Sequence, residues 1–184
     1  MEKIVKIPEG IEVNLEGDVL AVKGPKGELK REFKNPGIKT LVEPGKVTFS
    51  SESKRRSISA VMGTWASLVR NMINGVKWGW VCRLRLVYSH FPVKLKAEEG
   101  KLLIQNFLGE RKPRIARLLS GTETRVEKDE VIVTGADKEL VGQSCANIEQ
   151  TCTIKGRDRR VFQDGIWKLS KCKLDKGDKD EEAA

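Results

Sequence analysis

Apolar and polar residues alternate along two stretches of the chain, and each alternation is broken by a short polar turn. Residues 13–24 read VNLEGDVLAVKG, and residues 93–106 read VKLKAEEGKLLIQN. The interruptions, residues 16–18 and 98–100, place glycine beside acidic residues, as hairpin loops often do. Because alternation sends successive side chains to opposite faces of a strand, both stretches are predicted to form β-hairpins with one buried face.

Each predicted hairpin is followed by two shorter segments with the composition of strands. They cover residues 28–33 and 46–50 in the first half of the chain, and residues 114–119 and 130–134 in the second half. A longer apolar segment, residues 77–88, is expected to be a strand that closes the first half. The chain is therefore expected to be rich in strands that neighbour one another in the sequence, as in antiparallel sheets.

Two other segments show the spacing of a helix. Between residues 55 and 74 the apolar residues recur every three or four positions, which predicts one buried helical face. Asn74-Gly75 is expected to end this helix. A second helix is expected to begin after Asp137, whose carboxylate can accept hydrogen bonds from the first backbone N–H groups, and to present an apolar face as far as Cys152.

The two halves of the chain resemble each other at an offset of 79 to 84 residues. Gly63, Ala66 and Val69 of the first helix recur as Gly142, Cys145 and Ile148 of the second. An internal repeat of this kind predicts two copies of one structural unit. We therefore expect an α+β fold of two tandem similar units, residues 1–89 and 90–169, each an antiparallel β-sheet with one packed α-helix. Residues 170–184, with four lysines and five acidic residues, are expected to form a charged, disordered tail.

The composition is typical of a folded protein that does not enter a membrane. Of the 184 residues, 39% are hydrophobic and 33% are charged, which is enough apolar material for a buried core. No apolar run reaches the roughly 20 residues that span a bilayer, and the first residues carry charge where a signal peptide carries an apolar segment. The protein is therefore expected in the cytoplasm, without a membrane partner.

Side chains suited to catalysis or metal binding are sparse. The cysteines, at positions 82, 145, 152 and 172, lack the close pair that begins a structural zinc site, and we expect no metal and no cofactor. They are interpreted as small core residues. His90 is the single histidine, and no nucleophile stands beside it in the sequence. The alternative is a hydrolase or transferase with Cys82 or Cys145 as nucleophile and His90 as base.

Positive charge is concentrated in two runs of the second half, within a chain whose net charge is +9. Residues 111–117 hold four basic residues and no acidic one, and residues 155–160 hold four basic residues and one acidic one. Either run alone could be a solvated loop, but two such runs in one small unit indicate a surface for a polyanion. Because Phe107 and Phe162 are the aromatic residues nearest these runs, we expect recognition of phosphates and shape in folded RNA rather than base stacking on an exposed platform.

Three longer motifs stand out: VKGPKGEL at residues 22–29, NFLGERKPR at residues 106–114 and QTCTIKGRDRRVFQDGIW at residues 150–167. Together they resemble the large-subunit ribosomal protein six family, in its archaeal and eukaryotic branch. The resemblance extends over residues 7–168. At Trp167 the chain departs from the tyrosine that is usual in the family, which exchanges one large aromatic residue for another and puts only local packing in doubt.

The resemblance implies a structural, non-enzymatic constituent of the large ribosomal subunit that binds large-subunit rRNA mainly through the second unit. The site would lie near the sarcin-ricin and translation-factor-binding region, with the first unit toward the factor and stalk side. It also implies neighbouring ribosomal proteins as partners, with stalk-base proteins as candidates, and no small-molecule substrate. The implied rRNA contacts are Lys155, Gly156, Arg157, Arg159, Arg160, Arg111, Lys112 and Arg114. A free RNA-binding module or chaperone that never joins a ribosome is the second alternative.

Overall fold

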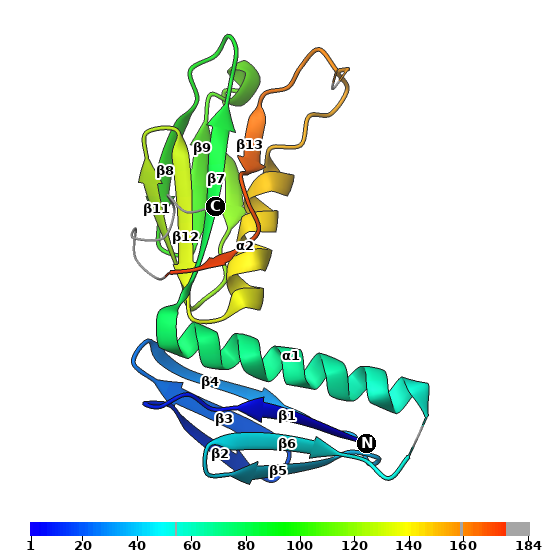
Figure 1. The fold of residues 1–184 in the computed structure, drawn as a ribbon. Coiled ribbons are helices and arrows are strands. Elements are labelled where there is room, and N and C mark those ends of the chain that lie inside the picture. Colours follow the sequence, from blue (N-terminus) through cyan, green and yellow to red (C-terminus); the bar gives the residue numbers. More distant parts are fainter. Residues whose placement is uncertain (54, 159, 176–184) are drawn as a thin grey trace, which may run out of the picture. The chain divides into compact units, whose positions relative to one another are not determined.

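The chain forms two units in the computed structural model, which describes residues 1–53, 55–158 and 160–175 (Figure 1). The first unit is Met1–Gly79, and the second begins at Trp80. Within the described residues, each unit combines antiparallel strands with one α-helix. The expected α+β class, with two tandem units of sheet and helix, is confirmed, although each unit divides its described strands between two sheets.

The described strands of the first unit lie in two antiparallel sheets. One contains, in spatial order, β2 (Glu12–Glu16), β3 (Val19–Gly24) and β4 (Gly27–Glu32). The other contains β1 (Glu2–Lys6), β6 (Lys46–Ser50) and β5 (Lys39–Glu43). The β2–β3 hairpin, β4 and β6 lie where the alternation predicts strands, whereas the alternation did not predict β1 and β5.

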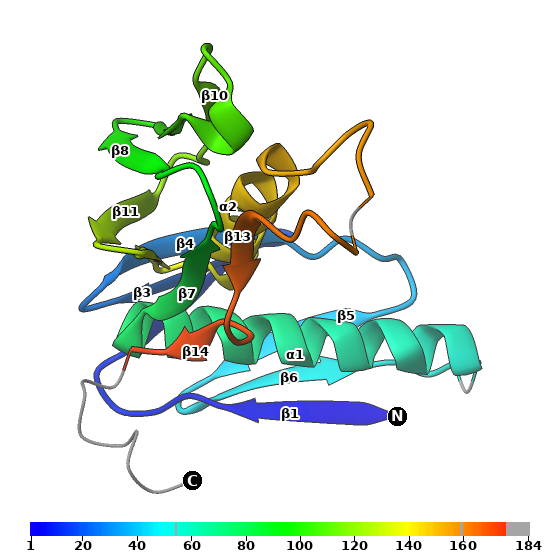
Figure 2. The ribbon, with the colours of Figure 1, turned by 90° about the horizontal axis from the view of Figure 1, so that it is seen from above.

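Helix α1 (Arg56–Trp78) runs along one face of these strands (Figure 2) and contacts β1, β3, β4 and β6. The helix does not end at Asn74-Gly75, as the sequence predicted, but continues to Trp78. Gly75 is buried within the helix, whereas Gly79 has φ +85° and donates its N–H to the carbonyl of Gly75 at 2.8 Å. The helix therefore ends at the glycine that adopts a positive φ, a conformation that costs other residues more.

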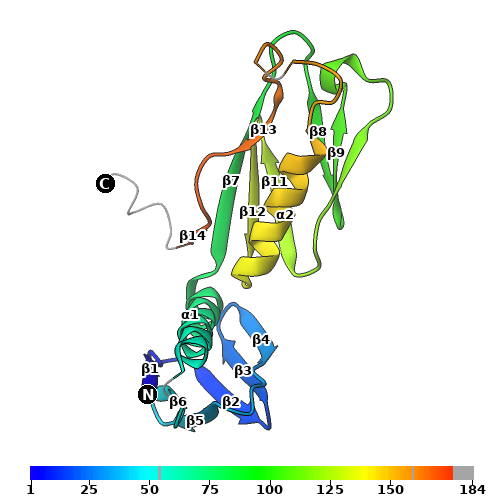
Figure 3. The same cartoon turned by 90° about the vertical axis from the view of Figure 1, so that its right-hand side faces the viewer.

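The central sheet of the second unit is built around β7 (Trp80–Val87) (Figure 3). Its spatial order is β11 (Thr122–Glu127), β12 (Glu130–Gly135), β7 and β13 (Gly165–Lys168), and the short β14 (Lys173–Leu174) also pairs with β7. A second sheet has the order β10 (Arg114–Arg117), β9 (Lys101–Gln105) and β8 (Lys94–Glu98). The β8–β9 hairpin, β10 and β12 lie where strands were predicted, whereas β11, β13 and β14 were not predicted.

Strand β7 corrects the boundary between the units, which the sequence placed between residues 89 and 90. The segment 77–88 does contain a strand, but that strand pairs with β12 on one side and with β13 and β14 on the other. Cys82, Leu84 and Leu86 of β7 are buried in the core of the second unit. Alternation identifies the core-facing side of a strand but not the sheet that it joins, so the boundary lies after Gly79 instead.

The tail also differs from its prediction where it is described. Residues 170–175 belong to the described part of the chain, and within them β14 pairs Lys173 with Val81 and Leu174 with Trp80. Leu174 packs, half-buried, against the core of the second unit. The prediction of a disordered tail over 170–184 is therefore wrong for its beginning, because backbone pairing with β7 and an apolar contact hold it. Residues 176–184 lie outside the described residues.

Helix α2 (Lys138–Thr151) packs against the central sheet and ends beside β13 (Figure 3). Its predicted N-cap is confirmed, because Asp137 Oδ1 accepts a hydrogen bond from the N–H of Glu139 at 2.8 Å. Val141 and Cys145 are buried between the helix and the sheet. No helix in the described part of the chain is both long and apolar enough to cross a membrane. The C-terminal end of α2 lies at the end of the unit where β7 leaves the sheet.

Candidate nucleic-acid interface

The two loops that carry the basic runs meet at one end of the second unit (Figure 3). The first loop, residues 106–113, connects β9 to β10 and contains the 3-10 helix η1 (Phe107–Gly109). The second loop, residues 152–164, connects α2 to β13. Arg114, at the start of β10, joins them, because its Nη1 donates a hydrogen bond to the carbonyl of Thr153 at 3.0 Å. Two runs that are distant in the sequence therefore lie next to each other in the fold.

The side chain of Arg114 is held by several contacts inside the protein. Its Nε donates to one carboxylate oxygen of Glu110 at 2.8 Å, its Nη2 donates to the other, and its Nη1 also donates to the carbonyl of Thr151 at 2.9 Å. The guanidinium lies 4.4 Å from the ring centre of the buried Phe107. Hydrogen bonding from Arg114 lowers the pKa of Glu110 below its usual range, and the charge of Arg157 acts in the same direction. Only 21% of the Arg114 side chain is exposed, so most of this cation faces the protein.

Hydrogen bonds within the second loop turn its backbone. Gly156 has φ +70°, and a Cβ added there would meet nothing within 4 Å. Asp158 Oδ1 accepts the backbone N–H of Arg160 at 2.9 Å, and the carbonyl of Asp158 accepts the N–H of Phe162 at 3.0 Å. The guanidinium of Arg157 lies 4.8 Å from the ring centre of Phe162. Asp158 therefore organises the backbone between the cations, as aspartate commonly does in turns.

Most of the predicted contact residues lie exposed at this end of the unit. They are Arg111, Lys112, Lys155, Gly156, Arg157 and Arg160, which we call the basic surface. Arg114 differs from them, because its guanidinium is turned toward Glu110 and the end of α2. Arg159 lies outside the described residues. The fold thus brings the two predicted runs together and separates Arg114 from the exposed set.

Two further contacts fix this end of the unit, and no local sequence pattern predicts either. Asp164 is buried and accepts hydrogen bonds at Oδ1 from the backbone N–H and the hydroxyl of Ser89, both at 3.2 Å. The ring of Phe91 packs against Gly109, where an added Cβ would lie 3.3 Å from it. The β7–β8 connection, residues 88–93, is therefore tied to both loops.

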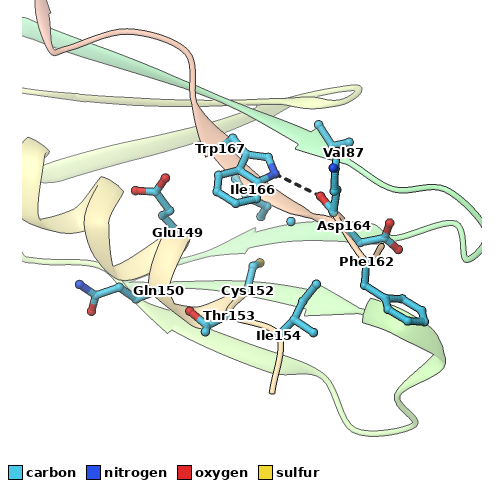
Figure 4. Close-up of a pocket in the computed structure, with 12 residues that line it drawn as sticks. Val87, Glu149, Gln150, Cys152, Thr153, Ile154, Phe162, Asp164, Ile166 and Trp167 are labelled. Carbon is cyan, nitrogen blue, oxygen red and sulfur yellow. Dashed lines mark hydrogen bonds between the residues drawn. The ribbon is translucent and has the colours of Figure 1, made fainter. Parts of the chain in front are cut away.

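A cavity of about 770 Å³ lies between the second loop, the last turn of α2 and β13 (Figure 4). Its lining includes the buried Cys152 and Ile166, the half-buried Phe162, and the exposed Gln150 and Trp167. The indole N–H of Trp167 donates to the carbonyl of Gln163 at 3.4 Å. The cavity therefore combines apolar and polar groups, and the loop beside it carries four of the six residues of the basic surface.

The geometry gives little support to a cysteine nucleophile. Cys82 and Cys145 are both buried, and hydrogen bonding with the Cys145 thiol raises the pKa of Cys82 to about 11. Burial likewise raises the pKa of Cys152 to about 11. His90 lies exposed in the β7–β8 connection, beyond the end of the strand that contains Cys82. Among the residues that the structure describes, no group of His, Cys, Asp and Glu side chains is arranged to hold a metal ion.

Comparison with known proteins connects this arrangement to one family. The family model for Ribosomal protein L6 matches the chain in two segments, residues 7–79 and 91–165. A large ribosomal subunit protein uL6 of Methanosarcina mazei is 48% identical over 169 residues, which are 92% of this chain and 96% of the relative. A protein of the same name in Methanospirillum hungatei is 47% identical over 171 residues, which are 93% of this chain and 97% of the relative.

Proposed function

This chain belongs to the ribosomal protein L6 family, and we propose that it is a structural component of the large ribosomal subunit that binds large-subunit rRNA through its second unit. The observation that carries the proposal is the meeting of two basic runs in one exposed surface, with Arg114 between them. The names of the relatives support it, because each is a large-subunit protein similar over more than 90% of this chain.

The basic surface suits the phosphate backbone of folded RNA. The guanidinium groups of Arg111, Arg157 and Arg160 can each donate paired hydrogen bonds to phosphate oxygens. The ammonium groups of Lys112 and Lys155 add positive charge without that geometry. Contacts of this kind supply much of the affinity for a nucleic acid, and their positions determine which folded backbone fits. The surface therefore favours a structured RNA over an isolated anion.

The remaining predicted contacts take different roles in this proposal. Gly156 lets a phosphate approach the backbone closely, because open space surrounds its Cα. Arg159 is included because Arg157 and Arg160, on either side of it in the sequence, both belong to the basic surface. Arg114 acts indirectly: its donors are taken by Glu110 and by backbone carbonyls, so it positions the two loops that carry the contacts.

The place of this surface in the ribosome is proposed from the family resemblance. The second unit would lie near the sarcin-ricin and translation-factor-binding region of the rRNA, and the first unit toward the factor and stalk side. Neighbouring large-subunit proteins, with stalk-base proteins as candidates, would be its protein partners. The protein would act in cytoplasmic ribosomes without catalysing a reaction, a role that fits the raised pKa of Cys82, because a neutral thiol is a poor nucleophile.

Sedimentation tests this proposal against a free RNA-binding module. A tagged copy of the chain is expressed in cells and the lysate is separated on a sucrose gradient in magnesium-containing buffer. The tagged protein is expected in the large-subunit, ribosome and polysome fractions, and chemical crosslinks to rRNA are expected mainly from the second unit. Protein found only at the top of the gradient, or crosslinked mainly to RNA outside the ribosome, would contradict a ribosomal role.

A further inference from the structure

We propose that the cavity beside Trp167 receives one unstacked nucleobase of the RNA whose backbone lies on the basic surface. This inference rests on the proposed function, because the base must belong to an RNA held by the neighbouring cations. It goes beyond that function because it assigns a site that binds a base. The sequence predicted only recognition of phosphates and of the shape of folded RNA. The aromatic residue that carries it, Trp167, lies outside both basic runs.

The position of the cavity connects it to the backbone site. The second loop forms one wall of the cavity, and Ile154 and Phe162 are among its lining residues (Figure 4). The same loop presents the exposed side chains of Lys155, Arg157 and Arg160 to solvent. A phosphate bound to these cations is covalently attached to a nucleoside that must lie within a few bonds of it. An RNA strand that crosses this loop can therefore turn one base into the cavity.

The size of the cavity fits such an occupant. Its volume of about 770 Å³ falls in the range of roughly 300 to 1,000 Å³ that is usual for small-molecule sites. A nucleobase with part of its ribose occupies less than this volume. Cys152 and Ile166, which are buried, provide an apolar floor that matches the face of a base.

Trp167 provides a fixed aromatic face for stacking. Its indole packs against the backbone of Gly165, where an added Cβ would lie 3.2 to 3.4 Å from the atoms of the ring system. The indole N–H is also held by the carbonyl of Gln163. Despite these contacts, 42% of the residue is exposed. A large aromatic side chain that is both held in place and open to solvent is suited to stack on an unpaired base, as aromatic residues do in RNA-binding proteins.

The other aromatic rings of the two loops are less available for stacking. Arg114 lies over the ring of Phe107, and Arg157 lies over the ring of Phe162. Both rings therefore support guanidinium groups. Trp167 is therefore the aromatic residue of the cavity whose ring is open to a base.

The cations on the outer side of the second loop favour RNA over a peptide as the occupant of the cavity. An extended peptide could add to the outer edge of β13, which borders the same cavity, by backbone pairing. Such a peptide would have no need of the three cations on the enclosing loop, whereas a nucleotide uses them for its phosphate. The charged residues in the lining are Glu149 and Asp164, so the preference for RNA depends on the three cations on the solvent side of the same loop. A nucleotide uses those cations for its phosphate and the aromatic face of Trp167 for its base.

The test compares binding of the full-length chain and its variants to in vitro transcribed large-subunit rRNA. Replacing Trp167 with Ala is expected to weaken binding on the order of 10-fold, because stacking of one base is lost. The slope of log affinity against log salt should stay unchanged, since no phosphate contact is removed. Trp167→Phe should keep most of the affinity, and Trp78→Ala, which removes an exposed tryptophan of the first unit, should keep all of it.

Two further readouts separate base stacking from a structural role. RNA should quench tryptophan emission in the wild-type chain, and this quenching should disappear in Trp167→Phe although the variant still binds. Chemical probing of the rRNA should show one base protected by the wild-type chain and reactive in the complex with Trp167→Ala. The inference is overturned if Trp167→Ala binds as tightly as the wild type, or if it loses only a protein partner.

The two proposals fail in different ways. The first variant replaces Lys155, Arg157 and Arg160 together with Ala. If this triple variant binds rRNA more weakly while Trp167→Ala binds as the wild type does, the nucleobase site is wrong and the proposed function stands. If neither variant changes binding, or the wild-type chain does not bind this rRNA, the proposed function itself fails.

Discussion

Nη1 of Arg114 donates a hydrogen bond to the backbone carbonyl of Thr153, 3.0 Å away. Arg114 begins β10, and Thr153 lies just beyond the C-terminal end of α2. The same nitrogen donates to the carbonyl of Thr151, so a cation is placed where the last carbonyls of a helix attract positive charge. The relative placement of the two basic runs therefore depends on a cation that is itself mostly covered.

Arg114→Lys tests this positioning role. Lysine keeps the charge but cannot hold Glu110 through two parallel hydrogen bonds while reaching the carbonyls of Thr151 and Thr153. We expect the variant to stay folded and to bind large-subunit rRNA roughly 10-fold more weakly, because the two loops lose internal hydrogen bonds of a charged group and must be ordered when the RNA binds. Amide hydrogen exchange should quicken in residues 152–164 and stay unchanged in the β8–β9 hairpin.

Glu110→Gln provides a sharper control for the same role. The change raises the net charge by one unit and releases Arg114 from its carboxylate partner. If Arg114 touched phosphate directly, this variant would bind rRNA more tightly. The positioning role predicts weaker binding in spite of the added charge, and tighter binding would contradict it.

The location of β7 leads to a prediction about fragments. Because β7 pairs with β12 on one side and with β13 on the other, a fragment of residues 80–184 should fold by itself, with a cooperative thermal transition in circular dichroism. A fragment of residues 90–184 lacks Cys82, Leu84 and Leu86 of the core and should not fold. A cooperative transition in the shorter fragment would place the boundary where the sequence pattern first put it.

Local patterns were sufficient for elements whose contacts are close in the sequence. The hairpin of β2 and β3 shows its alternation and its turn within residues 13–24, and Asp137 caps a helix that starts one residue later. Two other features of the fold depend on residues that local patterns do not reveal. The sheet that β7 joins is set by β12 and β13, and the end of α1 is set by which glycine, Gly75 or Gly79, takes a positive φ.

The candidate site shows the same division between local and distant information. Clustering of positive residues is visible in the sequence, and the two loops that carry these residues meet in the fold. Charge alone does not reveal that Arg114 is satisfied by Glu110 and by the end of a helix 37 residues away. Nor does it reveal the cavity, because Trp167 and Gln150 come from different elements.

Asp164 is expected to stabilise the second unit through its tether to Ser89. Asp164 is 5% exposed, and its carboxylate accepts two hydrogen bonds from Ser89. Asp164→Ala should lower the free energy of unfolding by about 1–3 kcal/mol, measured by urea denaturation, because charged hydrogen bonds are lost. Ser89→Ala removes one of the two hydrogen bonds and should lower the free energy of unfolding by about half as much. Equal stability of all three proteins would contradict the tether.

The buried thiols are expected to resist alkylation in the folded protein. With a pKa of about 11, Cys82 and Cys152 would each be about one part in a thousand thiolate at pH 8. Labelling by iodoacetamide, located by mass spectrometry, should therefore be slow at pH 8 and rise roughly tenfold per pH unit toward pH 11. Since these pKa values are raised on folding, the thiols favour the folded state below pH 9 and lose that contribution as the pH rises toward 11. Rapid labelling of Cys152 in the native protein at pH 8 would contradict its burial.

The salt dependence of rRNA binding tests the central claim most directly. Lys155, Arg157 and Arg160 are changed together to Ala, and the matched control changes Lys94, Lys96 and Lys101 of the β8–β9 hairpin, so that both variants lose three positive charges. The first variant should bind large-subunit rRNA on the order of 100-fold more weakly at moderate salt, with the slope of log affinity against log salt reduced by about 2. The control variant should lose much less affinity, and its salt slope should fall much less. Equal losses in the two variants would show that binding follows diffuse positive charge and that the basic surface is not the site.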